Sequence, residues 1–314
     1  MSVVSTDRSV RALLKQGIGQ LRAADVPSFT LAAELLLLHV TGRDRTWLYS
    51  HPEETLAEAV AEAYFALVAR RASGEPTQHL TGKQEFWGLE FEVTPEVLIP
   101  RPETEHLIEV ALDRLAVREI RAGRTPRTSG EGITLIDVGS GSGCIAVTLA
   151  KELPAATIYA TDVSKAALDV ARRNAARHGF AERIYFLESD RFEAFRPEGG
   201  RHGGQERGTA GAPLFDLIIS NPPYIGRREA ELLPVEVRHE PEVALFGGDE
   251  GYEFYGLLIP EAARQLKPGG LLVLELGYHS LPAVQPLFEA GWSNVGVTKD
   301  LAGIPRVLSA ERTS

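Results

Sequence analysis

Apolar residues in the first part of the chain recur every three to four positions, which is the period of an amphipathic helix. Ser28 stands where it can cap one such helix, and Gly42 stands where that helix should end. A second apolar stripe runs from Leu56 to Val68 and is followed by Gly74. The pattern predicts a small, all-helical N-terminal domain over residues 1–74.

In residues 75–102 the apolar positions no longer follow the helical period. Two short strand-like runs, 85–87 and 90–93, flank Gly88, which is the pattern of a β-hairpin. We expect this stretch to be a β-hairpin linker between two domains.

Helical and strand patterns alternate from residue 103 onward. Apolar strands are predicted at 133–138, 157–161, 183–188, 214–220 and 271–276, the last after a Lys-Pro-Gly-Gly turn at 267–270. Helices are predicted at 107–117, 145–152, 165–176 and near 254–266. Such alternation implies right-handed crossovers in a doubly wound, mostly parallel α/β sheet. The last two runs, 293–298 and 306–310, predict an antiparallel C-terminal strand pair that completes a domain over 103–314.

Composition narrows the class of protein. The 314 residues carry a net charge of −10, which argues against a broad nucleic-acid-binding surface. The single cysteine, Cys144, cannot form an intramolecular disulfide and fits a reducing compartment. No apolar run is long enough to span a bilayer, and the N-terminus has no secretory signal pattern. We therefore expect a cytoplasmic protein with no membrane partner.

Asn221, Pro222, Pro223 and Tyr224 end the apolar run 214–220. Proline cannot donate to a sheet ladder, so this motif would stop a buried strand. Ligands of open α/β sheets bind at the carboxyl ends of the strands. An amide side chain, rigidly held carbonyls and an aromatic face at that edge suit a planar group with two N–H donors. A plain strand-ending turn is the alternative interpretation.

A glycine-rich loop follows the first predicted parallel strand. After Asp137 and Val138 it consists of Gly139, Ser140, Gly141, Ser142 and Gly143. Glycines let the backbone turn closely around a ligand at a helix N-terminus. A dinucleotide site is the competing interpretation, but Cys144 stands where the third glycine of that motif would be. The acidic and hydroxylated neighbours also suit a zwitterionic amino-acid moiety better than a pyrophosphate.

Two acids follow the next two strands. Asp162 lies about 20 residues beyond the glycine loop, where a carboxylate accepts both ribose hydroxyls of a nucleotide. Nicotinamide proteins and S-adenosylmethionine proteins share that feature, so Asp162 does not separate them. Asp190 would either face an adenine edge or be a solvated acid or helix cap.

With these loops in view, the sequence resembles the HemK/PrmC family, S-adenosylmethionine-dependent methyltransferases of a glutamine side chain in peptide-chain release factors. The resemblance covers nearly the whole chain and is carried by residues 98–105 (Leu-Ile-Pro-Arg-Pro-Glu-Thr-Glu), 137–143, 221–225, 236–241 and 300–304. Asn-Pro-Pro-Tyr alone also occurs in adenine-N6 DNA methyltransferases. Its combination with the 98–105 segment and a helical N-terminal domain is specific, and it implies a Rossmann-like methyltransferase sheet with a helical substrate-recognition domain.

The resemblance also implies residue roles. Gly139 to Gly143, Asp162 and Asn221 would contact S-adenosyl-L-methionine, whose product is S-adenosyl-L-homocysteine. Asn221 to Tyr224 would hold the glutamine amide of the release factor. Arg191, after Asp190, stands where a family member has tryptophan. Either its guanidinium stacks on the adenine in place of the aromatic ring, or the adenine has no stacking partner at this position.

The chemistry expected of the motif follows from the substrate. An amide nitrogen is a poor nucleophile because its lone pair is delocalised into the carbonyl. We expect the Asn221 side-chain oxygen to accept one N–H and the Pro222 carbonyl the other, while Tyr224 packs on the amide plane. No strong general base is required. No metal is expected either, since the eight histidines form no pattern such as H-E-x-x-H.

Three alternatives stay open at this point. Adenine-N6 methylation of nucleic acid would use the same acceptors, but it predicts a basic groove that the acidic chain does not suggest. Glutamine methylation of a ribosomal protein would need the same catalytic residues. A non-catalytic binding module would keep the fold without methyl transfer.

Residues 196–213 are rich in glycine and charge and lack apolar periodicity, so we expect a mobile surface insertion. They contain Gly203, Gly204 and Gln205, the tripeptide that the resembled family methylates in release factors. The segment could be a pseudosubstrate or a self-methylation site at Gln205. We favour a chance occurrence, because the insertion enters the following strand at the end opposite the expected site.

Overall fold

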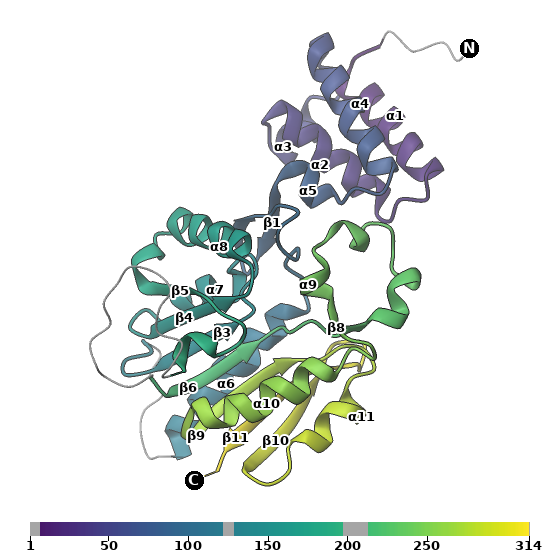
Figure 1. The fold of residues 1–314 in the computed structure, drawn as a ribbon. Coiled ribbons are helices and arrows are strands. Elements are labelled where there is room, and N and C mark those ends of the chain that lie inside the picture. Colours follow the sequence, from purple (N-terminus) through teal and green to yellow (C-terminus); the bar gives the residue numbers. More distant parts are fainter. Residues whose placement is uncertain (1–6, 122–128, 197–212, 314) are drawn as a thin grey trace. The chain divides into compact units, whose positions relative to one another are not determined.

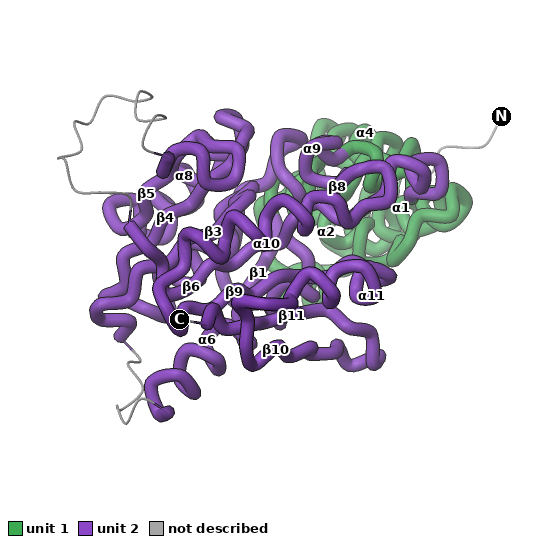
Figure 2. Tube along the Cα trace, turned by 60° about the horizontal axis from the view of Figure 1, so that its bottom comes forward, with its two compact units in different colours: residues 1–83, 234–239 green, residues 84–233, 240–314 purple. Residues whose placement is uncertain are grey.

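The computed structural model describes residues 7–121, 129–196 and 213–313 (Figure 1). Nearly all of the 196–213 insertion, with its Gly203-Gly204-Gln205 tripeptide, lies outside the described residues. The chain forms two compact units, residues 1–83 with 234–239 and residues 84–233 with 240–314 (Figure 2). No helix in the described ranges is long and apolar enough to cross a membrane.

The first unit is helical. Its helices are α1 (Val10–Ala23), α2 (Phe29–Thr41), α3 (Arg45–Ser50), α4 (Glu58–Ala72) and α5 (Thr77–Thr81). Their apolar stripes meet in one core that includes the fully buried Leu36, Leu37 and Tyr64. Gly42 ends α2 in the left-handed conformation, as predicted, and donates its N–H to Leu38. Ser28 stands at the N-cap of α2, as predicted, but with a φ of 50° and no side-chain bond to the helix N-terminus.

A distant segment completes the helical unit. Residues 234–239 belong to it, although the chain on both sides of them belongs to the sheet unit. Arg71, which is 4% exposed, donates to the carboxylate of Glu236. Gly74 has a φ of 106°, and any side chain there would overlap Val235. This unit therefore ends at Lys83 and includes α5, whereas the sequence pattern predicts that the helical domain ends at residue 74.

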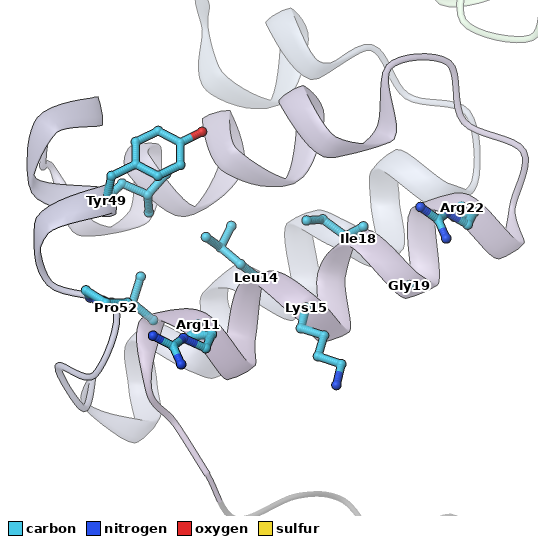
Figure 3. Close-up of a pocket in the computed structure, with 10 residues that line it drawn as sticks. Arg11, Leu14, Lys15, Ile18, Gly19, Arg22, Tyr49 and Pro52 are labelled. Carbon is cyan, nitrogen blue, oxygen red and sulfur yellow. The ribbon is translucent and has the colours of Figure 1, made fainter.

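A groove of about 540 Å³ lies along α1 (Figure 3). Its walls include the apolar Leu14 and Ile18, and the cationic Arg11, Lys15 and Arg22 stand along it. Arg11 is ion-paired with Glu53 at 2.7 Å. All residues that line this groove belong to the helical unit, so it contains none of the predicted site residues.

The second unit is built on a seven-stranded sheet in the order β10-β11-β9-β6-β3-β4-β5. Its strands are β3 (Thr134–Val138), β4 (Thr157–Asp162), β5 (Ile184–Glu188), β6 (Phe215–Ser220), β9 (Leu266–Glu275), β10 (Trp292–Lys299) and β11 (Pro305–Arg312). The five strands from β9 to β5 run parallel, whereas β11 is antiparallel to both β9 and β10. The predicted mostly parallel sheet with an antiparallel C-terminal pair is confirmed.

Helices cover both faces of this sheet. They are α6 (Thr104–Arg121), α7 (Cys144–Glu152), α8 (Lys165–Arg177), α10 (Glu253–Gln265) and α11 (Leu281–Val284). A further short helix, α9 (Glu242–Leu245), contributes no residue to either core of the sheet. Successive strand residues point to opposite faces, so Leu217 and Ile218 of β6 join different cores. One core contains α6 and α7, the other contains α10, and Figure 1 shows α6 and α10 on opposite sides of the sheet. Burial on both faces explains why central strands such as β3 and β6 read as largely apolar runs.

Smaller elements complete the chain. They are the hairpin β1 (Lys83–Phe86) and β2 (Leu89–Glu92), the parallel pair β7 (Ile225–Gly226) and β8 (Phe246–Gly248), and five 3₁₀ turns, Ala181–Arg183, Glu193–Phe195, Arg227–Leu232, Val237–His239 and Gln285–Leu287. Trp87 and Gly88 join β1 to β2, both with positive φ, which matches the twist of a two-residue hairpin turn. The predicted turn at 267–270 is instead part of β9, which begins at Leu266 and carries an irregularity opposite Phe215 and Leu217.

A buried acid ties the amino ends of the sheet together. Asp216 accepts bonds from Lys267 at 2.6 Å, from the Thr134 N–H at 2.9 Å and from Arg118 at 3.0 Å. Burial opposes ionisation, but these donors outweigh it and hold the pKa of Asp216 below its ordinary value of 3.8. Its ionised form therefore stabilises the fold above that pH.

We predict that Asp216→Ala lowers the free energy of unfolding at pH 7 by about 2–3 kcal/mol, because it leaves buried donors unpaired. This loss of unfolding free energy is smaller than that for a fully buried ion pair, because the Lys267 side chain is 39% exposed. The depressed pKa means that this contribution is present above pH 3.8 and is lost as the pH falls through the lower folded value. Urea unfolding at pH 7 and pH 3 tests this. A wild-type advantage that is equal at both pH values would contradict it.

Candidate active site

The carboxyl ends of three neighbouring strands bring the predicted site residues to one edge of the sheet. β3 lies between β4 and β6, and the chain builds outward from β3 first through β4 and later through β6. Ligands of open α/β sheets bind beside the carboxyl ends of the strands at such a reversal of direction. The glycine loop follows β3, Asp162 ends β4 and Asn221 follows β6.

The Asn-Pro-Pro-Tyr motif is fixed by close backbone packing. β6 is buried along its whole length, and Ser220 donates its hydroxyl to the Val138 carbonyl at 2.6 Å. A side chain at Gly247 would overlap the Pro223 carbonyl oxygen, and a Cβ at Gly251 would lie 2.5 Å from the Tyr224 carbonyl oxygen. Pro222 is buried within this arrangement. The motif is therefore held on both sides and is more than a turn that ends a strand.

The Asn221 side chain has one satisfied end and one unsatisfied end. Its Nδ2 donates to the Thr104 hydroxyl at 3.1 Å. Its Oδ1 is buried and has no hydrogen-bond partner. A buried carbonyl oxygen without a donor is costly unless a ligand supplies one. The unpaired atom is the acceptor that the sequence predicts for a substrate N–H.

Glu275 connects Thr104 to Tyr224. It stands at the end of β9, is 1% exposed, and accepts from the Thr104 hydroxyl at 2.7 Å and from the Tyr224 hydroxyl at 3.4 Å. Burial raises the pKa of Glu275 to about 7, against the lowering effect of these hydroxyls. A Cβ at Gly277 would lie 3.0 Å from the Tyr224 ring, so glycine there leaves room for the ring. Sequence patterns do not predict Glu275, Gly247, Gly251 or Gly277 as site residues, and they include Thr104 only within the 98–105 segment.

The glycine loop has the backbone that only glycine adopts easily. Gly139, Gly141 and Gly143 have φ values of 77°, 53° and 80°. A Cβ at Gly139 or Gly141 would meet open space, whereas one at Gly143 would lie 2.9 Å from the Ala171 Cβ. The first two glycines thus leave room for a ligand, and Gly143 lets the loop pack against α8.

The side chains around this loop include buried acceptors. Asp137 is fully buried, and burial raises its pKa to about 8. Its Oδ2 accepts from the Ala146 N–H at 3.2 Å, but its Oδ1 has no partner, nor does the Ser140 hydroxyl. Ser142, two residues further on, is 2% exposed, and its carbonyl accepts from Asn174 at 2.9 Å. Unpaired buried acceptors beside a glycine cradle fit the ammonium of an amino-acid moiety.

Asp162 links the loop to the end of β4. Its Oδ2 accepts from the Gly141 N–H and its Oδ1 from the Ser164 N–H, both at 2.9 Å. Burial nonetheless raises its pKa above the ordinary value. A carboxylate has about four acceptor positions, so Asp162 keeps acceptor capacity for further donors such as ribose hydroxyls.

Arg191 is engaged by protein groups. Its guanidinium bonds Asp190 at 2.7 Å and Glu261 of α10 at 3.2 Å, and it lies 5.8 Å from the centre of the Phe254 ring. Its side chain is 13% exposed, whereas that of Asp190 is 45% exposed. These interactions tie the Arg191 side chain to α10 and to its neighbour, while Asp190 keeps a solvent-facing side.

Among the described residues, no group of three or more His, Cys, Asp or Glu side chains could hold a metal ion. The site is therefore described by its amide, carboxylate, hydroxyl and backbone groups.

Two family models match the chain. The PrmC N-terminal domain matches residues 12–82, and a methyltransferase domain matches residues 129–290. The fold also resembles solved structures of the hMettl16 catalytic domain with MAT2A 3'UTR hairpins. The TM-score is 0.54 for hairpin 1, at 16% identity, over 79% of this chain and 80% of that chain. The fold and the matched domains define a methyltransferase with a PrmC-type N-terminal domain.

The chain belongs to the release factor glutamine methyltransferase family, which confirms the HemK/PrmC resemblance. The relative from Koribacter versatilis is 42% identical over 301 residues, 96% of this chain and 97% of its own length. The relative from Moorella thermoacetica is 40% identical over 306 residues, 97% of this chain and 99% of its own length. Both carry the name release factor glutamine methyltransferase.

Proposed function

We propose that the protein transfers the methyl group of S-adenosyl-L-methionine to the side-chain amide nitrogen (N5) of the glutamine in the Gly-Gly-Gln motif of release factors. The observation that carries the proposal is the buried, unpaired Oδ1 of Asn221 at the carboxyl edge of the sheet. A primary amide offers two N–H donors, and Oδ1 lacks one donor. Membership of the family supplies the identity of the amide-bearing substrate.

The chain's own groups position the amide. Asn221 Oδ1 would accept one N–H of the glutamine, and the Pro222 carbonyl would accept the other. These acceptors would hold the nitrogen in place and stabilise the positive charge that develops on it, while Pro223 and Tyr224 would pack against the amide plane. Methylation makes the remaining N–H groups of the nitrogen strongly acidic, so one proton is lost to solvent after the transfer and no strong general base is needed.

The residues of the glycine loop fit the cofactor. When bound, S-adenosyl-L-methionine supplies an electrophilic methyl on a sulfonium, and S-adenosyl-L-homocysteine remains as product. Gly139, Ser140, Gly141, Ser142 and Gly143 would line its amino-acid moiety, beside the unpaired Asp137 Oδ1. Asp162 would accept the ribose hydroxyls and Asp190 would face the adenine. Because Arg191 is already ion-paired, we assign it to holding this loop rather than to an adenine stack.

The test is methyl transfer from radiolabelled cofactor to purified release factor, to the same factor with its Gly-Gly-Gln glutamine changed to alanine, to ribosomal protein and to adenine-containing DNA. We expect label only in the unaltered release factor. Label in DNA or ribosomal protein alone would overturn the assignment of substrate. Cofactor binding without transfer to any of them would indicate a binding module.

A further inference from the structure

We propose that Thr104 and Glu275 are positioning residues that fix which end of the Asn221 amide faces the substrate. Asn221 can take part in methyl transfer only if its oxygen, and not its NH₂ group, points at the glutamine nitrogen. The two ends of an amide are nearly equal in shape, so shape alone does not choose between them. This inference rests on the proposed function.

The direction of the hydrogen bonds makes the choice. An ionised Glu275 carboxylate only accepts, so the single proton of the Thr104 hydroxyl is used on its Oε2 at 2.7 Å. Thr104 Oγ1 can then only accept from Asn221, which must turn its Nδ2 toward it, as seen at 3.1 Å. Oδ1 is left on the opposite side, buried and without a partner. The hydrogen-bond chain Glu275–Thr104–Asn221 thus leaves Oδ1 as the acceptor that faces the substrate.

The same carboxylate restrains the other end of the motif. Tyr224 directs its hydroxyl to the second oxygen of Glu275 at 3.4 Å. Glu275 itself is held by its strand, since the Tyr255 hydroxyl donates to its backbone carbonyl at 2.7 Å. Thr104 begins α6 and Glu275 ends β9, so the hydrogen bond between them joins two rigid elements. Sites that are built on such elements hold their geometry better than loops do.

The pH dependence of turnover follows from this direction. A protonated Glu275 could donate to the Thr104 hydroxyl. The Thr104 proton would then be free to bond Asn221 Oδ1, which favours the reversed amide with its NH₂ group toward the substrate. Burial raises the pKa of Glu275 to about 7, the bonds from Thr104 and Tyr224 and the charge of Arg306 lower it, and the charge of Glu103 raises it. We expect kcat to rise with pH through this range, and Glu275→Gln to lose that step. A Glu275→Gln variant whose kcat still rises with pH as in the wild type would contradict this role.

The central experiment compares Thr104→Val with Thr104→Ser at saturating cofactor. Valine keeps the shape but removes the acceptor, so kcat should fall about 10- to 100-fold, the size expected for a misplaced reacting group. Serine keeps the hydroxyl and should stay within about threefold of wild type. The cofactor Kd, measured by calorimetry, should be little changed in both variants.

Thr148→Val is the matched control. Thr148 is a fully buried threonine of α7 whose hydroxyl has no partner, so its replacement reports the effect of the substitution type alone. The inference is overturned if Thr104→Val keeps the wild-type kcat or if kcat falls as far in Thr104→Ser as in Thr104→Val. It is also overturned if the fall in kcat parallels a fall in melting temperature. Failure of the wild-type protein to methylate glutamine would instead overturn the proposed function.

Discussion

Replacing Asn221 with alanine is expected to lower kcat about 10²- to 10³-fold, the usual loss when one preorganised group that stabilises the transition state is removed. The reason lies in its unpaired Oδ1, which is the buried acceptor that the amide N–H would meet. Alanine leaves one N–H of the glutamine without a partner and frees the nitrogen to rotate. Because Asn221 follows a strand that is held by its neighbours, the fold should persist.

The measurement is single-turnover methyl transfer to release factor at saturating cofactor, together with thermal unfolding. Asn294→Ala is the matched control, because Asn294 is an exposed amide on β10 that bonds Glu311. That variant should lose stability rather than turnover. Near-normal turnover in Asn221→Ala would remove Asn221 from the catalytic assignment.

The sequence predicts the sheet unit well because its central strands, such as β3 and β6, are buried on both faces. Runs such as 157–161 and 214–220 are largely apolar, although Asp216 lies within the second, and the structure places β4 and β6 within one residue of them. The glycine loop and the motif after β6 follow from the same pattern, because both come directly after such a run. Local sequence therefore locates the edge of the sheet where the candidate site lies.

Features that depend on distant partners were not predictable in this way. Thr104 and Glu275 are separated by 171 residues, and a hydroxyl and a carboxylate at that separation form no motif. Residues 234–239 join the helical unit through Arg71 and Gly74, which a contiguous division of the chain could not anticipate. In each case tertiary contacts, rather than local periodicity, decide where the residues belong.

Asp162→Ala is expected to weaken cofactor binding about 100-fold, which corresponds to about 2.7 kcal/mol. This is the size expected for losing hydrogen bonds from two hydroxyls to one carboxylate. The variant also removes the acceptor of the Gly141 and Ser164 N–H groups, so the glycine loop should become less ordered. Calorimetric titration with S-adenosyl-L-homocysteine measures the effect without turnover.

Asp169→Ala separates this effect from the loss of one negative charge. Asp169 is an acid of α8 that pairs with Lys165 and Arg172 at the surface, so its removal changes the net charge equally but leaves the loop intact. It should bind the product with the wild-type Kd. The Kd of Asp162→Asn should lie between those of Asp162→Ala and Asp169→Ala, because one acceptor oxygen remains while the charge is lost. Equal Kd values for Asp162→Ala and Asp169→Ala would mean that Asp162 makes no contact with the ribose, and the cofactor would then have to be held by the loop alone.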